Sequence, residues 1–154
     1  MSDPVNIHAC CVAIGNKGVL LLGKSGAGKS DIALRLIDGG AKLVADDRTI
    51  LFVKSGALHA KAPATIQGLL EIRSVGIVEM PVRSQIRLAM AVMLGRESAR
   101  LPEPQFWNAP APLRMNTKLP QITLDARYAS TPARIRAALT AFSNEALRDN
   151  FNLK

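Results

Sequence analysis

Hydrophobic residues in this chain form short runs separated by glycine, proline and polar turns, a pattern typical of strands alternating with helices. The longest such run, residues 86–94, is predicted to be a buried strand because Arg87 is its only charged residue. The other predicted strands are residues 7–14, 19–23, 42–47, 49–53, 57–61 and 121–124. Together they predict an α/β fold.

Two helices are predicted from apolar residues spaced three and four positions apart. The first follows Ser30 and ends at Gly39 and Gly40, and the second begins with Thr131 as N-cap and Pro132 as its first residue. The first helix would bury Ile32, Ala33, Leu36 and Ile37, and the second Ile135, Ala138, Leu139, Phe142 and Ala146. Residues 102–120, which are rich in proline, predict an irregular surface segment in which Trp107 is an interface residue or a local anchor.

The first two strands are separated by a short glycine turn, so we expect them to pair antiparallel. If Ile14 faces Val19, His8 falls opposite Ser25 and lies beside the turn that follows the second strand. A neutral imidazole at this place could orient a carboxylate or share its proton. A histidine that only satisfies a backbone carbonyl at the sheet end is an equally good interpretation.

The turn after the second strand has the phosphate-loop pattern G-x-x-x-x-G-K-S/T, between a predicted strand and a predicted helix. The pattern residues are Gly23, Lys24, Ser25, Gly26, Ala27, Gly28, Lys29 and Ser30. Its glycines let backbone N–H groups surround an anion at the positive end of the helix dipole. Lys29 would reach the outer phosphates and the Ser30 hydroxyl would hold Mg²⁺. The alternative is a glycine-rich turn without a ligand.

Asp46 and Asp47 end the third strand, which should run parallel to the second and therefore finish at the same edge as the phosphate loop. Paired acids at this position could bind Mg²⁺ through water, accept a proton, or cap a solvated turn. Neighbouring strand residues point in opposite directions, so we expect the two to do different work. Farther along, alternation in residues 66–78 sets Glu71 and Arg73 on one face, as a surface ion pair or part of a mobile functional loop.

Composition narrows the class of protein further. The 154 residues are 48% hydrophobic and 21% charged, which favours one globular domain over residues 1–154. No apolar run is long enough to span a membrane and no secretory signal is evident, so we expect a cytoplasmic protein. The net charge of +8 suits nucleotide, phosphate or an acidic partner, whereas dispersed charge and few aromatic residues do not favour nucleic acid. Cys10 and Cys11 are expected to be reduced core residues.

Four ordered motifs resemble the catalytic domain of the HPr kinase/phosphorylase family. They are His8, the phosphate loop from Gly23 to Ser30, the strand end at Asp46 and Asp47, and the run Gly-Leu-Leu-Glu-Ile-Arg-Ser-Val-Gly at residues 68–76. The resemblance spans about residues 7–124. It implies a P-loop-containing mixed β-sheet with flanking helices, of the HPr kinase and PEP carboxykinase type.

The resemblance also implies an activity, namely transfer of phosphate from ATP, with Mg²⁺, to a serine of the phosphocarrier protein HPr. Reverse phosphorolysis with inorganic phosphate would give pyrophosphate, and family members assemble as hexamers. On matching positions, Lys29 holds the transferred phosphate, Ser30 and Glu71 bind the metal, and Asp47 is the acid/base. Asp46 would support Asp47, and His8 and Arg100 match further catalytic residues of the family.

The chain departs from the family pattern in three places. The family's N-terminal domain is absent, so a short form is expected. The family's basic loop, tied to phosphorolysis, is replaced after Leu124 by Asp-Ala-Arg-Tyr, and Ser74 stands where a glycine is usual. Because the replaced loop is tied to phosphorolysis, we expect the kinase direction to be retained. A nucleotide-binding regulatory module without transfer activity and a small-molecule P-loop kinase stay open as alternatives.

Overall fold

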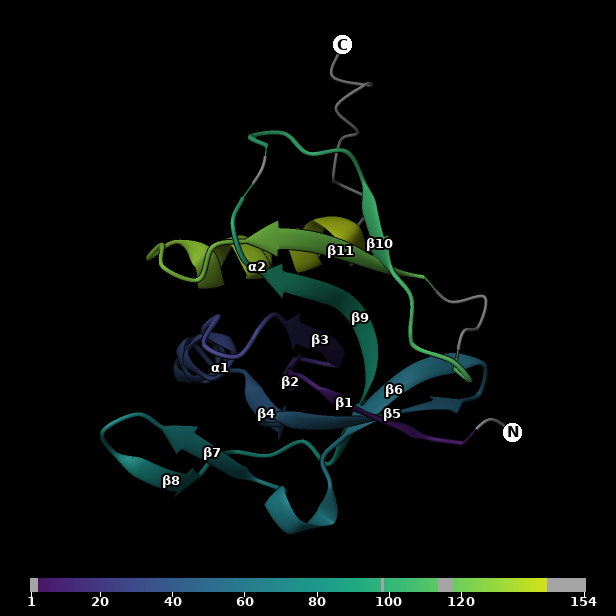
Figure 1. The fold of residues 1–154 in the computed structure, drawn as a ribbon, viewed down its shortest axis with the longest axis vertical. Helices are drawn as coiled ribbons and strands as arrows, with labels where there is room; N and C mark the ends of the chain where they lie inside the picture. The colour runs from purple at the N-terminus through teal and green to yellow at the C-terminus, as the bar shows by residue number, and fades with distance from the viewer. Residues whose placement is uncertain (1–2, 98, 114–117, 144–154) are drawn as a thin grey trace.

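The computed structural model of this chain describes residues 3–97, 99–113 and 118–143, which form one curled mixed sheet with helices packed on it (Figure 1). The helices are α1 Lys29–Asp38 and α2 Thr131–Ser143, with a 3-10 turn at Ala64–Ile66. The sheet strands are β1 Val5–His8, β2 Cys10–Ile14, β3 Lys17–Leu22, β4 Lys42–Ala45, β5 Arg48–Lys54, β6 Ala57–Lys61, β9 Gln85–Leu94, β10 Gln105–Trp107 and β11 Leu119–Leu124. A separate hairpin consists of β7 Leu69–Ile72 and β8 Gly76–Glu79. The predicted α/β fold is confirmed.

β9 is the strand on which the two halves of the sheet meet. Its first residues pair antiparallel with β6, and its last residues pair parallel with β11. The parallel neighbour β3 takes the opposite edge of β9. β9 curves strongly along its length, so the sheet curls around the molecule rather than lying flat (Figure 1). The prediction of a long buried strand at residues 86–94 is confirmed.

The predicted N-terminal hairpin has the right partners and the wrong register. The expected strand 7–14 is interrupted at Ala9, so β1 pairs with β5 while β2 pairs antiparallel with β3. Ile14 faces Lys17 rather than Val19, and His8 faces Arg48 rather than Ser25.

Two glycines explain the register. Gly15 has φ +61°, which permits a tight two-residue turn. Gly18 belongs to β3 rather than to the turn, because a Cβ there would lie 2.9 Å from the Arg87 carbonyl oxygen on β9. The backbone of β3 therefore approaches β9 at a point where only glycine fits.

β4 runs in the predicted direction, although it is not next to β3. Both strands are antiparallel to β2, which lies between them, so β4 and β3 run parallel and end at the same sheet edge. The phosphate loop and the acidic pair therefore emerge side by side, as the sequence predicted. The hairpin predicted at residues 49–53 and 57–61 is also present, as β5 and β6.

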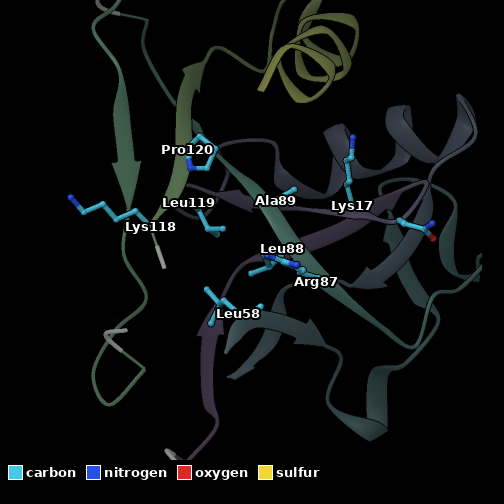
Figure 2. Close-up of a pocket in the computed structure, with 10 residues that line it drawn as sticks. Lys17, Leu58, Arg87, Leu88, Ala89, Lys118, Leu119 and Pro120 are labelled. Carbon is cyan, nitrogen blue, oxygen red and sulfur yellow. The ribbon is translucent and has the colours of Figure 1, made fainter. Parts of the chain in front are cut away.

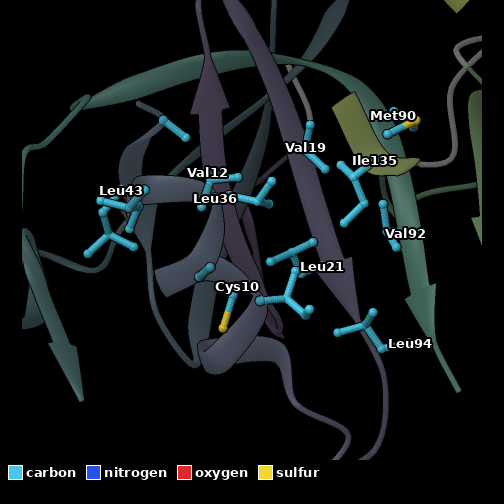
Figure 3. Packing of buried hydrophobic residues seen from close by; sticks show 14 of the residues in the cluster. Cys10, Val12, Val19, Leu21, Leu36, Leu43, Met90, Val92, Leu94 and Ile135 are labelled. Carbon is cyan, nitrogen blue, oxygen red and sulfur yellow. The ribbon is translucent and has the colours of Figure 1, made fainter. Parts of the chain in front are cut away.

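Two hydrophobic clusters lie on the two faces of β2 and β3. The first cluster, beneath α1 and α2, includes Cys10, Val12, Leu21, Leu36 and Ile135 (Figure 3). The second, on the other face, includes Cys11, Leu20, Leu22, Val44 and Leu51. The predicted apolar face of α1 is buried, and each such aliphatic side chain contributes about 1.5–3 kcal/mol through burial. In α2, Ile135 and Leu139 are buried and Ala138 and Phe142 partly so, whereas Ala146 lies outside the described residues.

The proline-rich stretch is only partly irregular. It contains β10, which pairs antiparallel with β11, and β11 begins at Leu119 rather than at the predicted Gln121. Trp107 packs against the second cluster, so it is a local anchor of this segment. Across the described residues, no helix combines the length and the apolar character needed to cross a membrane.

Candidate active site

The phosphate loop connects the end of β3 to the beginning of α1. Gly23, Gly26 and Gly28 have φ values of +147°, +84° and +100°, conformations that side chains with a Cβ rarely adopt. A Cβ at Gly23 would also lie 2.9 Å from the Leu94 carbonyl oxygen, and one at Gly28 would lie 2.9 Å from the Ala126 Cβ. The loop is therefore a glycine-dependent cradle whose N–H groups and helix end favour an anion.

Lys29 is the first residue of α1, and its side chain is buried in the loop. Its ammonium nitrogen donates hydrogen bonds to the carbonyl oxygens of Gly23 (2.8 Å) and Lys24 (3.0 Å). The ammonium group is therefore held within the loop by two carbonyl oxygens. Binding of a phosphate would allow it to exchange carbonyl partners for phosphate oxygens.

Asp46 is buried at the centre of a hydrogen-bond network. Its Oδ1 accepts from the Ser30 hydroxyl at 2.7 Å and from the Cys10 thiol at 3.1 Å. Its Oδ2 accepts from the backbone N–H of Glu71 at 3.1 Å. One carboxylate therefore joins the beginning of α1, the beginning of β2 and the β7–β8 hairpin.

Asp47 points the other way, into the open cavity. Its backbone is left-handed at φ +66°, and its Oδ1 lies 3.0 Å from His8 Nε2. Its side chain is 69% exposed, whereas Asp46 is buried. The two neighbouring acids thus have different environments, so they are not a solvated turn alone.

A cavity of about 1010 Å³ opens between the phosphate loop and the hairpin. Its lining residues are His8, Cys10, Ser25, Gly26, Gly28, Lys29, Ser30, Asp31, Leu34, Asp47 and residues 71–77. Glu71 and Arg73 are therefore on the cavity wall, and within the described chain they form no ion pair with each other. Arg100, on the exposed segment after β9, is not among the lining residues.

Ser30 and Glu71 on the cavity wall, with the buried Asp46 behind them, form a donor set that fits Mg²⁺. Ser30, Asp46 and Glu71 offer hydroxyl and carboxylate oxygens, the ligands that this hard cation prefers. Among the residues that the structure describes, no group of three or more His, Cys, Asp and Glu side chains forms a metal cage. In nucleotide sites Mg²⁺ is usually held by one or two carboxylates together with waters and phosphate oxygens.

A polar network joins α2 to the segments that follow β9 and β11. Arg134 donates from its two terminal nitrogens to the Glu97 carboxylate (3.2 and 3.0 Å), and Glu97 also accepts from the Asp125 N–H at 2.8 Å. These contacts lower the pKa of Glu97, and the Arg127 guanidinium lowers the pKa of Asp125 to about 2. The Glu97 side chain is 28% exposed, and its contact with Arg134 partly shields it from solvent.

Figure 2 shows a second cavity, of about 450 Å³, at the opposite end of β3. Its floor is apolar, with Leu58, Leu88 and Leu119, and Lys118 extends away from it (Figure 2). The Lys118 ammonium instead lies 5.7 Å from the centre of the Phe106 ring. Lys17 and Arg87 line this cavity as well, and its lining residues include no carboxylate, so it does not combine cations with acidic side chains as the first cavity does.

Cys10 is the site residue that the sequence did not suggest. It was expected to be a reduced core residue, and it is free and buried, but it also lines the cavity and contacts Asp46. Burial and the neighbouring Asp46 charge raise the pKa of this thiol to about 12. The only available signal was its position two residues after His8, since alternate strand residues share a face.

Comparison with known proteins identifies the family. Residues 1–101 match the HPr Serine kinase C-terminal domain. A Brevibacillus brevis protein named HPr kinase/phosphorylase is 35% identical over all of this chain and 50% of its own length, and one from Leptothrix cholodnii is 40% identical over 64% of the chain and 35% of its own length.

The solved structure titled Hpr(Ser) kinase/phosphatase from Coxiella burnetii has the same fold, with a TM-score of 0.77 at 23% identity. The alignment covers 92% of this chain and 98% of that one. The chain spans half the length, or less, of the curated relatives named above. The matching residues 1–101 contain the phosphate loop, the acidic pair and the hairpin that form the cavity. The chain therefore belongs to the HPr serine kinase C-terminal domain family.

Proposed function

We propose that this chain is an ATP-dependent kinase that transfers phosphate to a serine hydroxyl of the phosphocarrier protein HPr. The observation that carries the proposal is the meeting of three groups at one cavity. These are the glycine cradle with Lys29, the Ser30–Asp46 pair at 2.7 Å, and the His8–Asp47 pair at 3.0 Å. The names of the curated relatives supply the protein substrate.

The phosphate loop would hold the donor. Its backbone N–H groups and the N-terminus of α1 surround the phosphates, and Lys29 moves from the Gly23 and Lys24 carbonyls to phosphate oxygens. Phosphoryl transfer depends mainly on position and charge neutralisation, so a buried lysine in a fixed loop is suited to it.

Ser30, Asp46 and Glu71 would hold Mg²⁺ together with the phosphates. The ion neutralises charge on the phosphate oxygens when it is bound. Asp46 already accepts from Ser30 and from the Glu71 N–H, which fixes both residues relative to one carboxylate. Asp46 thereby holds the hairpin residue and the helix residue close to each other.

Asp47 would accept the proton of the acceptor serine. As the serine oxygen bonds to the γ-phosphorus, its proton passes to the Asp47 carboxylate and the bond to the ADP leaving oxygen breaks. His8 Nε2, 3.0 Å from Asp47 Oδ1, orients this carboxylate. In phosphorolysis, Asp47 would return the proton to the serine oxygen while inorganic phosphate takes the phosphoryl group.

A transfer assay tests the proposal. The purified chain is incubated with γ-labelled ATP, Mg²⁺ and HPr, with HPr whose acceptor serine is replaced by alanine as the control. Label on the first HPr alone supports the kinase. ATP binding without label on HPr would favour a regulatory module, and turnover with a metabolite library but not HPr would favour a small-molecule kinase. A second reaction with phosphoserine-HPr and inorganic phosphate measures pyrophosphate release.

The family resemblance extends the proposal to assembly and compartment. We propose that the subunits form a hexamer in the cytoplasm, as members of the family do. Light scattering on the eluting protein measures the mass of the assembly. If the protein is a monomer at assay concentration and transfers phosphate at full rate, the proposed hexamer is wrong and the proposed kinase activity stands.

A further inference from the structure

Cys10 lies where both acidic residues of the site are held. Its sulfur is at one end of the first hydrophobic cluster and points away from Val12 and Leu36 (Figure 3). The thiol donates to Asp46 Oδ1 at 3.1 Å and its sulfur accepts from the Asp47 N–H at 3.4 Å. Its sulfur is also 3.9 Å from the Ser30 hydroxyl oxygen. One side chain thus contacts three residues of the proposed transfer machinery.

Three consecutive residues hold Asp47 from three sides. His8 pairs with its carboxylate, the Ala9 N–H donates to its carbonyl oxygen at 3.1 Å, and Cys10 accepts from its N–H. Asp47 is left-handed at φ +66°, a conformation that needs local hydrogen bonds to be favoured in a residue with a side chain. The interruption of the strand at Ala9 brings all three partners to one residue.

Cys11 has none of these contacts and provides an internal comparison. It lies in the second cluster on the opposite face of β2, and among the residues that the structure describes its thiol donates only to the Val12 carbonyl oxygen, at 3.9 Å. Both cysteines are buried and both are free. Their burial is therefore matched, whereas only Cys10 touches the site.

We propose that Cys10 is a positioning residue, which aims the Asp46 carboxylate at Ser30 and fixes the Asp47 backbone so that its side chain faces His8 and the cavity. The inference rests on the proposed function, because it assigns a role within that same site. A thiol suits this place since it is a donor to Asp46 and an acceptor from Asp47 at once.

Four variants test the inference. Cys10→Ala removes donor and acceptor, and Cys10→Ser keeps both in a smaller atom, while Cys11→Ala and Cys11→Ser make the same changes on the other face. We expect Cys10→Ala to lower kcat by about 10- to 100-fold, the range for a lost hydrogen bond to a buried charge, with the KM for ATP changed by less than about threefold. We expect Cys10→Ser to recover most of this loss. The Cys11 variants should keep kcat within about twofold per folded molecule.

Metal affinity provides a measurement that needs no turnover. We expect Mn²⁺ binding to the protein with ADP, followed by electron paramagnetic resonance, to weaken about tenfold in Cys10→Ala, because Asp46 loses the donor that aims it. Cys11→Ala should leave this affinity unchanged. A merely structural role for Cys10 would lower the unfolding temperature of both alanine variants and move neither the Mn²⁺ affinity nor kcat.

Infrared spectra report the thiol directly. Each serine variant retains a single cysteine, because the chain has only two. We expect the S–H stretching band of Cys10 to lie below that of Cys11 and to move when Mg²⁺ and ADP bind. Coincident bands, together with unchanged kcat and Mn²⁺ affinity in Cys10→Ala, would overturn the inference. If the wild-type chain fails to phosphorylate HPr, the proposed substrate is wrong, while the metal and infrared measurements still decide the role of Cys10.

Discussion

The two walls of the cavity are built in different ways. One wall consists of the phosphate loop, Asp46 and Asp47, which directly follow strands β3 and β4 of the main sheet. The core residues of these strands are buried. The facing wall is the β7–β8 hairpin, a two-stranded sheet of its own that projects from the body (Figure 1). At its tip, Val75 and Ile77 are 72% and 71% exposed.

The hairpin is attached to the body through β7, whose Leu70 and Ile72 pack against the first cluster. Leu70 is its one fully buried side chain among the described residues and belongs to the first cluster, and the Glu71 N–H reaches Asp46. Two-stranded hairpins are marginal unless they pack on something else. The difference implies that groups handling phosphate charge sit on a fixed platform, while the wall with the exposed apolar tip can adjust to an acceptor.

The largest effect is expected on the fixed wall, from Asp47→Asn. The amide keeps the shape and can still contact His8, but it is a far weaker base, so kcat should fall about a thousandfold. Nucleotide affinity, measured with a fluorescent ADP analogue, should change by less than about twofold. Asp38→Asn, at the far end of α1, removes the same charge and should have no effect on kcat. Equal activity of wild type and Asp47→Asn would exclude Asp47 as the base.

The attachment of the hairpin is tested by Leu70→Ala. Truncating a fully buried leucine costs about 2–5 kcal/mol of unfolding free energy, and here it also loosens the anchor of β7. Chemical denaturation measures the global loss, and hydrogen exchange of the β7–β8 amides measures the local one.

Leu20→Ala is the matched control, because Leu20 is equally buried in the second cluster. Both variants should lose similar global stability, while only Leu70→Ala should raise exchange in the hairpin far above that in the sheet and weaken Mg²⁺-nucleotide binding. Uniform exchange increases in the two proteins would show that the hairpin unfolds only with the rest.

The contrast between the walls also explains what the sequence could reveal. Local signals are strong where one pattern dictates one geometry: the glycines and Lys29 identified the loop, and the direction of β4 placed Asp46 and Asp47 beside it. The predicted register of His8 was wrong because it depends on which glycine belongs to the turn. Gly18 lies in β3 and packs closely against β9, a strand far away in the sequence. Cys10 was missed for a related reason, since its contacts come from Asp46 and Asp47 on another strand.

Glu97→Gln should loosen the segment after β11, whose Ala126 lies beside Gly28 of the phosphate loop. The pKa of Glu97 is lowered by Arg134 and the Asp125 N–H, so the fold favours its ionised form. The stabilisation is present above the ordinary glutamate pKa of 4.5 and is lost as the pH falls below that value. We expect the variant to lose about 1 kcal/mol at pH 7, because the pair is partly exposed, and the difference to shrink below pH 4.5.

Thermal unfolding across pH measures this effect. One kcal/mol corresponds to about 3 °C in a chain of this size. Glu103→Gln, on an exposed segment, should shift the unfolding temperature much less at pH 7. A difference between Glu97→Gln and wild type that grows on acidification would contradict the assigned sign.

The smallest effect is expected from replacing a serine with a left-handed backbone by glycine, once in the hairpin and once in the main sheet. Ser74, in the β7–β8 turn, has φ +65°, and Ser55, in the β5–β6 turn of the main sheet, has φ +53°. Glycine relieves the strain of this conformation but adds disorder to the unfolded chain, so each change should alter stability by less than about 0.5 kcal/mol. The two variants should therefore unfold alike.

The Ser74 and Ser55 variants should differ in activity, because of these two turns only the β7–β8 turn lines the cavity. We expect Ser74→Gly to raise hydrogen exchange at the hairpin tip and change the KM for HPr about two- to threefold, which is less than one factor of ten in binding. Ser55→Gly should leave that KM unchanged. Identical KM values for the two variants would mean that the hairpin is as fixed as the sheet, and the distinction between the walls would then be one of shape alone.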